Sequence, residues 1–276
     1  MEKKEAPVVH VAGLKTFHLI VIVVLIVQAF FLGSLWTKVE VLKSGNTATA
    51  PQQAGGQAAG TQQQAQAPVI TLAQVKDAFA KSFVKFGDAN SKLLLIEVAD
   101  PSCPYCHIAA GLNGELNKQV GDRFTLVSDG GSYVAPVPEM KKLVDSGKAA
   151  FAWLYTSGHG NGEMGTKAMY CAFEKGKFWE VHDRLMTAEG YDLLNNNVKN
   201  DKTKSGELSQ FLAGVFDQSS MKECLDSGKY DARIGEDVAL ARSVGVSGTP
   251  GFFVNETNFA GAYSYKDMES VVNAAL

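Results

Sequence analysis

The chain has 276 residues, with 26 Lys and Arg, 29 Asp and Glu, and a formal net charge of −3. Its 46% hydrophobic and 20% charged residues are ordinary for a globular protein, which excludes the fibrous and the wholly disordered classes. No basic patch accompanies this slightly acidic balance, so no nucleic-acid partner is expected.

An uncharged apolar segment lies near the N-terminus. Residues 19–36, LIVIVVLIVQAFFLGSLW, are long enough to nearly cross a hydrocarbon layer of about 30 Å as a helix. Lys38 and Glu40 follow closely, with no small-x-small cleavage site beside them, so we expect an uncleaved transmembrane anchor. The lysines flanking the segment favour a cytoplasmic N-terminus, residues 1–18. We therefore predict a single-pass protein of the cell membrane whose C-terminal part is extracytoplasmic, in the periplasm or at the cell surface.

A low-complexity segment separates this anchor from the rest of the chain. Residues 44–68, SGNTATAPQQAGGQAAGTQQQAQAP, hold no charge and no large apolar side chain, so they cannot bury enough surface to offset chain entropy. We predict a flexible linker over 37–68 and a folded domain over 69–276.

The folded part begins with a helix and a strand. Residues 71–83 start with Thr71 and Gln74 at capping-box spacing, and their apolar side chains continue at helical spacing as far as Phe83. The run KLLLIEV at 92–98 is almost continuously apolar, which is typical of a strand covered on both faces.

The remaining elements follow the same periodicities. From Cys106 to Val120 an apolar residue recurs at every fourth position, which predicts one helix starting at the CPYC motif. Further on, the sequence predicts a strand, a long helical stretch without strands, two more strands and a closing helix, at 149–155, about 163–244, 251–255, 258–263 and 265–276.

Residues 103–107 read CPYCH, and a Cys-x-x-Cys motif serves haem attachment, zinc binding or redox chemistry. Haem attachment matches the letters, but a buried strand precedes the motif, and Pro104 would pin the segment that has to open for a porphyrin. Structural zinc needs four ligands, and the other two cysteines, Cys171 and Cys224, are single and lie 53 positions apart. A redox dithiol fits best, so no cofactor and no metal ion are expected.

The predicted helix start explains how the two thiols would divide the chemistry. The N-terminus of a helix presents unsatisfied N–H groups, which stabilise a thiolate and lower the pKa of Cys103. Cys106 lies one turn further along, close enough to attack the mixed disulfide that Cys103 forms with a substrate. Pro104 suits the first turn, where its missing N–H is not needed. Cys103 is therefore the expected nucleophile and Cys106 the resolving thiol.

The order of these features resembles one protein family. A strand, C-P-x-C at a helix start, a large helical insertion and the later GVSGTPGFFVN are similar to the DsbA-like branch of the thioredoxin superfamily over residues 70–276. The resemblance implies a thioredoxin-like α/β fold with an inserted helical subdomain at about 163–244. It also implies that Pro250 is cis, that Thr249 faces the dithiol, and that this pair holds the substrate segment in an extended form.

The resemblance also implies roles for residues around the motif. Glu97 lies six residues before Cys103, where relatives carry a half-buried acid that moves protons to and from the resolving cysteine, here Cys106. An unpaired buried carboxylate is costly, which favours a functional reason for keeping it. Pro104 and Tyr105, inside the motif, are expected to contact the substrate beside the cis-proline loop.

The other cysteines and the histidines have structural or local interpretations. Cys171 and Cys224 are either free buried thiols or a disulfide across the helical insertion, and an oxidising compartment favours the disulfide. His107, one residue after the motif, either tunes the thiol pKa or covers the helix end. His159 in the glycine-rich SGHGNGEMG is expected in an exposed loop, and His182 is expected to pack against its helical neighbours.

Three features depart from the family pattern. Tyr105 stands where the strong bacterial oxidase of this family has a histidine that stabilises the thiolate, which lowers the expected oxidising power. Residues 120–148 form a longer link than the family requires, and we expect an extra hairpin and a short helix there. Gly251, after the proline, should widen the substrate groove.

These observations predict a membrane-anchored, extracytoplasmic thiol–disulfide oxidoreductase. Its expected partners are cysteine-containing protein substrates, a redox partner that recycles the dithiol, and the membrane through the N-terminal helix. The sequence shows no dimerisation domain of the kind many isomerases have, so we favour the oxidase direction. The alternatives are a disulfide reductase or isomerase using the same site, and a non-catalytic surface adaptor or chaperone.

Overall fold

The computed structural model describes residues 70–276. The predicted cytoplasmic N-terminus, membrane anchor and linker, at 1–18, 19–36 and 37–68, lie outside the described residues. Within 70–276 no helix is both long enough and apolar enough to cross a membrane. The elements below are those of residues 70–276, which lie within the range expected for the folded domain.

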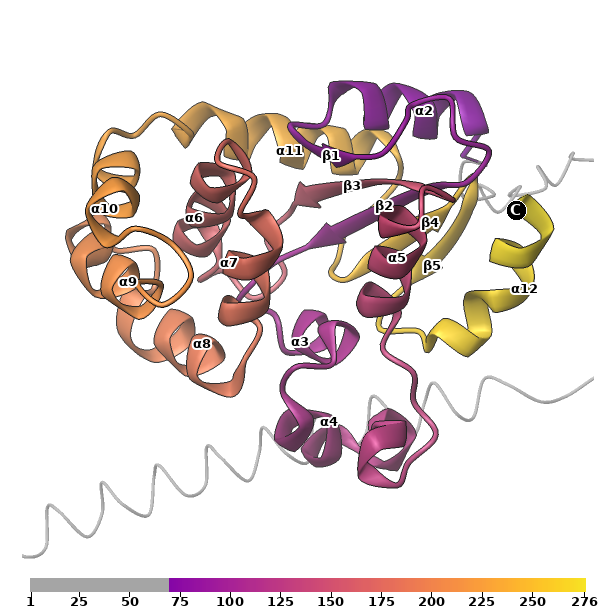
Figure 1. Ribbon diagram of the computed structural model, residues 1–276, viewed down its shortest axis with the longest axis horizontal. Coiled ribbons are helices and arrows are strands. Elements are labelled where there is room, and N and C mark those ends of the chain that lie inside the picture. Colours follow the sequence, from indigo (N-terminus) through magenta and orange to yellow (C-terminus); the bar gives the residue numbers. More distant parts are fainter. Residues whose placement is uncertain (1–69) are drawn as a thin grey trace, which may run out of the picture. The chain divides into compact units, whose positions relative to one another are not determined.

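A five-stranded sheet, in the order β1-β3-β2-β4-β5, forms the centre of the fold (Figure 1). Central β2 runs parallel to β3, and the other neighbouring pairs are antiparallel. All six residues of β2 and all six of β3 are buried, as their continuously apolar sequences predicted. The strands are β1 (Val84–Phe86), β2 (Leu94–Ala99), β3 (Ala150–Tyr155), β4 (Gly251–Val254) and β5 (Thr257–Ala260).

Helices cover both faces of this sheet (Figure 1). Alternate residues of β2 and β3 pack on one face against α2 (Leu72–Lys81) and the end of α11 (Asp231–Ser243). The other face meets the larger part of the core, which includes both cysteines of CPYC. Helices on that side include α5 (Pro136–Asp145) and α12 (Tyr265–Ala275). The coarse prediction of a thioredoxin-like α/β fold is confirmed.

The helical insertion follows β3. The described residues between α6 and α11 contain no strand, as predicted for 163–244. Cys171 on α6 and Cys224 on α10 form a disulfide, with Cα atoms 6.2 Å apart, so they are not available to the motif cysteines as zinc ligands. The helices of the insertion before α11 are α6 (Glu163–Phe173), α7 (Phe178–Leu185), α8 (Ala188–Asp192), a π-helical turn (Leu193–Val198), a 3₁₀ turn (Lys202–Lys204), α9 (Ser205–Phe211) and α10 (Gln218–Asp226).

The first predicted helix is too long by two residues. The capping box of Thr71 and Gln74 is present, but α2 ends at Lys81 because Ser82 adopts an extended conformation and donates its hydroxyl to the carbonyl of Ala78 at 2.7 Å. Phe83 was expected in the helix but instead precedes the edge strand β1. The apolar periodicity did not predict this strand. The ring of Phe83 packs against aromatic rings of the insertion.

The single helix predicted from Cys106 to Val120 is wrong, because the chain breaks it into α3 (Pro104–Ala110) and α4 (Gly114–Val120). Gly111 ends α3 with φ +69°, and a Cβ on it would lie 2.5 Å from the Cβ of Ala135. Only glycine combines that backbone conformation with so close an approach.

The link before β3 contains the predicted short helix, α5, but not the expected hairpin. Two 3₁₀ turns, Asp122–Phe124 and Val127–Asp129, precede it, and the only strand-like pairing within residues 121–135 is one isolated bridge between Leu126 and Tyr133.

Candidate active site

The two cysteines of CPYC lie at the start of α3, directly after the turn that leaves β2. Cys103 caps the helix and is 4% exposed, and Cys106 is fully buried one turn further on. Both are free thiols. Pro104 occupies the first turn, as predicted, and the N–H of Cys103 donates to the carbonyl of Asp100 at 2.9 Å.

Donors converge on Cys103. Its pKa is lowered from 9 to about 6, first by the hydrogen bond from the thiol of Cys106. The nearby hydroxyl of Thr249, although it makes no hydrogen bond within the described residues, and the backbone N–H groups of Cys106 and Tyr105 act in the same direction. Together they outweigh burial, which opposes them. Cys103 is therefore mainly a thiolate at neutral pH.

Cys106 has the opposite character. Burial raises the pKa of this thiol well above 9, and the hydrogen bond to Cys103 and the nearby charge of Glu97 raise it further. The N–H of Asp100 donates to its sulfur at 3.4 Å. The structure thus separates a buried, protonated thiol from a thiolate one turn earlier in the helix, which is the division of roles that the spacing predicted.

The loop before β4 faces the dithiol. The Thr249–Pro250 bond is cis, and the thiol of Cys103 lies 3.5 Å from the carbonyl oxygen of Thr249. Gly251 lines a groove of about 320 Å³ that also includes Thr249 and Pro250, and a Cβ on it would lie 3.0 Å from Cγ1 of Val246. The missing side chain therefore leaves space beside the cis-proline and lets β4 begin against Val246.

A buried carboxylate beside the motif was missed by the sequence reasoning. Asp100 accepts hydrogen bonds from the N–H and hydroxyl of Ser102, at 2.8 and 2.6 Å. Its other oxygen accepts from the N–H groups of Gly158, His159 and Gly160, at 2.8, 2.9 and 3.3 Å. Asp100 therefore ties the turn before Cys103 to the glycine-rich loop after β3.

The same loop holds the cis-proline segment in place. A Cβ on Gly158 would lie only 1.7 Å from the hydroxyl oxygen of Thr249, so the two segments are in direct contact. His159 is exposed, as predicted, but the backbone around it is a structural part of the site. The glycines of this loop and the Asp-Pro-Ser before the motif were the available signals.

Glu97 is more deeply buried than the family resemblance implied. It lies in central β2 with no exposed surface, and neither carboxylate oxygen has a hydrogen-bond partner among the described residues. Burial raises its pKa from 4.5 to about 7, although the nearby imidazole of His182 opposes this. The carboxyl can therefore gain or lose a proton near neutral pH.

The surroundings of His107 favour a role in covering the helix end over a role in tuning the thiol pKa. It is fully buried, with its ring nitrogens 2.8 Å from the carbonyl oxygen of Pro101 and 2.9 Å from that of Met186. Burial lowers its pKa to about 4, so the ring is neutral and donates from one nitrogen. The ring packs between the turn before α3 and the end of α7 and donates a hydrogen bond to one of the two carbonyl oxygens.

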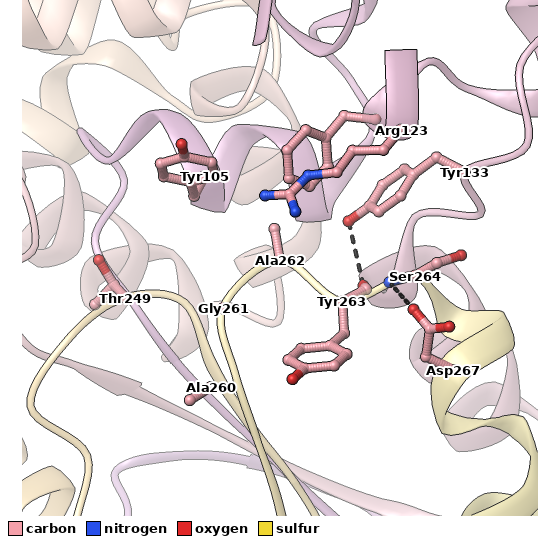
Figure 2. A pocket seen from close by; sticks show the side chains of 11 residues that line it. Tyr105, Arg123, Tyr133, Thr249, Ala260, Gly261, Ala262, Tyr263, Ser264 and Asp267 are labelled. Atoms are coloured by element: carbon pink, nitrogen blue, oxygen red, sulfur yellow. Dashed lines mark hydrogen bonds between the residues drawn. The ribbon is translucent and has the colours of Figure 1, made fainter. Parts of the chain in front are cut away.

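A pocket of about 540 Å³ opens beside the motif (Figure 2). Tyr105 is 41% exposed on its wall, and its ring packs edge-on against Phe124 with centroids 5.9 Å apart. Arg123 lies over the same Phe124 ring at 4.4 Å. Thr249 forms the wall nearest the dithiol, and Tyr263 lines the side built by the chain after β5. The pocket thus joins the motif, the cis-proline loop and the unpredicted turns before α5.

Comparison with known families places part of this domain. Residues 138–274 match the family model described as Thioredoxin, a range that begins after the CPYC motif.

Solved structures extend the likeness across the described domain. BdbD from Bacillus subtilis, in its oxidised form, is 16% identical with a TM-score of 0.50, and the match covers 69% of this chain and 91% of that one. An alpha-DsbA1 structure from Wolbachia pipientis is 16% identical with a TM-score of 0.53, covering 73% of this chain and 95% of that one. These matches show that the described domain shares its fold with these two proteins.

Curated relatives place a similar sequence within larger proteins. Na(+)/H(+) antiporter NhaA 3 from Salinispora tropica is 26% identical over 193 residues, which are 68% of this chain and 24% of that protein. The antiporter NhaA of Herminiimonas arsenicoxydans is 24% identical over 190 residues, with 68% and 25% covered. The chain spans about a quarter of the length of these relatives.

Proposed function

We propose that this chain is an extracytoplasmic thiol–disulfide oxidoreductase that exchanges disulfides with cysteine-containing proteins through Cys103 and Cys106. One observation carries the proposal: two free thiols lie one helical turn apart at the start of α3, and the first of them faces the cis Thr249–Pro250 loop. Their surroundings lower the pKa of Cys103 to about 6 and raise that of Cys106 well above 9. A low thiol pKa makes Cys103 both the reactive thiolate and a good leaving group.

In the oxidase direction, a substrate thiolate attacks the sulfur of Cys103 in the enzyme disulfide. The bond to Cys106 breaks, and Cys106 leaves with the electron pair and takes up a proton. A second substrate thiolate then attacks the substrate sulfur of the mixed disulfide, and Cys103 leaves as a thiolate. The substrate loses two electrons and the dithiol gains them, so a disulfide-bearing redox partner is needed to take them up again.

Four residues would hold the substrate near this chemistry. The backbone of Thr249 and Pro250 would bind an extended segment beside the reacting cysteine, since the Thr249 carbonyl already faces Cys103. Pro104 and Tyr105 would contact the segment from the motif side. The adjoining pocket would take a neighbouring substrate side chain against the ring of Tyr105. Replacing Tyr105 by alanine should weaken peptide binding without changing the reaction with glutathione.

The low pKa of Cys103 favours the oxidase direction. A stabilised thiolate stabilises the reduced dithiol, which makes the disulfide form a stronger oxidant. Tyr105 supplies no imidazole to this thiolate, but the thiol of Cys106 and the hydroxyl of Thr249 contribute instead. The predicted anchor at 19–36 would hold the domain in the extracytoplasmic space, where disulfides persist.

The reduction potential of the full chain, measured in glutathione buffers by counting alkylated thiols, tests the direction. The oxidase account predicts a value well above the ~−270 mV of thioredoxin, and a value near or below that would support a reductase instead. Two results together would indicate an adaptor or chaperone: the unsubstituted chain exchanges no disulfides, and Cys103→Ser binds unfolded proteins as well as the unsubstituted chain does.

A further inference from the structure

Buried polar atoms accumulate on the face of the sheet that carries the dithiol. Both carboxylate oxygens of Glu97, the indole nitrogen of Trp153 and Nε2 of His182 have no hydrogen-bond partner among residues 70–276. Buried polar groups are normally paired with protein groups or with ordered water. Unpaired buried donors and acceptors of this kind indicate a site where water can bind and protons can pass from one group to the next.

Packing brings these groups to one side of β2 and β3. Glu97 and Trp153 are partners in the parallel register, so their side chains lie on the same face of the sheet. The ring of Trp153 is 6.1 Å from that of Phe178 on α7, and Phe178 stacks on His182 at 5.8 Å. The imidazole of His182 is close enough to Glu97 to lower the pKa of its carboxyl.

The two ends of this arrangement reach the dithiol and the surface. On the inner side, the charge of Glu97 acts on Cys106, whose sulfur has no exposed surface. On the outer side, Nδ1 of His182 lies 2.8 Å from a carboxylate oxygen of Asp183. The side chain of His182 is 1% exposed and that of Asp183 is 52% exposed. The thiol of Cys106 is thus connected to solvent by three groups in turn: Glu97, His182 and Asp183.

We propose that His182 and Asp183 carry protons between Glu97 and solvent during disulfide exchange, an inference that rests on the proposed function. An imidazole suits this task because it can accept a proton at one ring nitrogen and release one from the other. Neither residue touches substrate, so both act through Glu97.

When a disulfide-bearing partner recharges the dithiol, the Cys103 thiolate first attacks the partner disulfide, and one partner sulfur leaves as a thiolate, which forms a mixed disulfide. The thiol of Cys106 then gives its proton to the carboxylate of Glu97. The Cys106 thiolate attacks the sulfur of Cys103, and the partner sulfur leaves with the electron pair. Glu97 then passes the proton through bridging water to Nε2 of His182, and the Nδ1 proton moves to Asp183 and into solvent. The movement reverses when Cys106 leaves as a thiolate during substrate oxidation, which returns His182 to its first tautomer.

The other titratable groups around this path are already engaged. His107 on α3 also faces His182, but both its ring nitrogens lie against backbone carbonyl oxygens. On α6, Tyr170 donates its hydroxyl to Asp237 of α11. Within the described part of the chain, His182 is therefore the buried titratable group near Glu97 with an unpartnered nitrogen.

The test uses the full chain with His182→Gln and Asp183→Asn, and Glu180→Gln as the matched control. Glu180 is an exposed carboxylate on the same helix, paired with Lys177 rather than with the imidazole. Single-turnover oxidation of a dithiol peptide is followed across pH in H₂O and in D₂O. Alkylation of Cys103 in the reduced chain is followed in parallel, because that reaction neither makes nor breaks a bond to Cys106.

The Cys106-dependent step should slow about tenfold in His182→Gln, less than the roughly 100-fold cost of removing a positioned acid or base. Its pH profile and solvent isotope effect should change, and Asp183→Asn should slow the step to a smaller extent. Glu180→Gln and the alkylation of Cys103 should be unaffected. A Cys106-dependent step indistinguishable from that of the unsubstituted chain in both variants, or an equal loss in Cys103 alkylation, would overturn the proposal.

Infrared titration of the Glu97 carboxyl supplies a readout that does not depend on exchange. The band, assigned by its loss in Glu97→Gln, should titrate near pH 7 in the unsubstituted chain and at higher pH in His182→Gln, because the interaction that lowers the pKa is gone. An unchanged midpoint would overturn the coupling. If instead the midpoint moves but the unsubstituted chain exchanges no disulfides, the proposed function fails, and with it the role in exchange.

Discussion

Replacing Glu97 by glutamine should stabilise the protein at alkaline pH, because the substitution removes a carboxylate that is costly to ionise inside the sheet. The folded-state pKa of Glu97 is about 7, against 4.5 for an unperturbed glutamate. At roughly 1.4 kcal/mol per pKa unit, this displacement corresponds to about 3 kcal/mol of unfolding free energy. The residue has no exposed surface, so solvent does not screen the effect.

The sign follows from proton binding. Below pH 4.5 the carboxyl is protonated in both the folded and the unfolded state, and its contribution to stability is fully present. Between 4.5 and about 7 only the folded state keeps the proton, so stability falls as pH rises. Above 7 both states are ionised, and the loss of about 3 kcal/mol is complete. Glutamine has no proton to lose and avoids this fall.

Urea unfolding of the full chain, followed by tryptophan fluorescence at pH 4.5 and pH 8, measures the effect. The unfolding free energy of Glu97→Gln minus that of the unsubstituted chain should increase by about 3 kcal/mol between the two pH values. Glu115→Gln, which changes an exposed glutamate on α4, should show no such increase. A Glu97→Gln difference that stayed constant with pH would refute the reasoning.

Three further outcomes are expected. Alkylation of Cys103 should follow a titration with its midpoint at about pH 6, and a midpoint near 9 would contradict the donor set at the site. Gly158→Ala should raise that midpoint, measured in the same way, because the new Cβ would lie 1.7 Å from the hydroxyl oxygen of Thr249 and displace it; an unchanged midpoint would show that Thr249 stays in place. Removing the disulfide in a Cys171→Ser, Cys224→Ser double variant should lower the unfolding free energy by about 4 kcal/mol for a 53-residue separation, as measured in urea, and a negligible loss would argue against the cross-link.

Local patterns predicted the elements whose signals lie within a few residues. The capping box of Thr71 and Gln74 begins α2, and continuous apolar runs became the buried strands β2 and β3. The same spacing rule failed at Phe83, because an aromatic residue at helical spacing can equally pack from a neighbouring edge strand. It failed again at Gly111, where contact with Ala135 requires a left-handed turn that apolar periodicity does not register.

The arrangement around the dithiol was only partly accessible from the sequence. CPYC and Thr-Pro were recognisable as short motifs, and the structure brings Cys103 and Thr249 together. The hydrogen bonds of Asp100 join residues about 60 positions apart, so no local pattern reports them. The complete burial of Glu97 likewise follows from the packing of helices over β2, which a lone acid in an apolar run only suggests.

The pocket wall could not have been predicted. Residues 121–135 contain short turns and a single bridge, and Phe124 of this segment meets the ring of Tyr105 only through the tertiary fold. Only the length of the link at 120–148 indicated additional structure before β3.

Trapping the mixed disulfide tests the central claim most directly. The full chain with Cys106→Ser, oxidised by mixing with a cysteine-containing peptide disulfide, should retain the peptide on Cys103, because the resolving thiol is missing. Mass mapping of the adduct should place it at Cys103, and Cys103→Ser should abolish it. No adduct, or an adduct that persists in Cys103→Ser, would contradict a thiol–disulfide exchange reaction at this site.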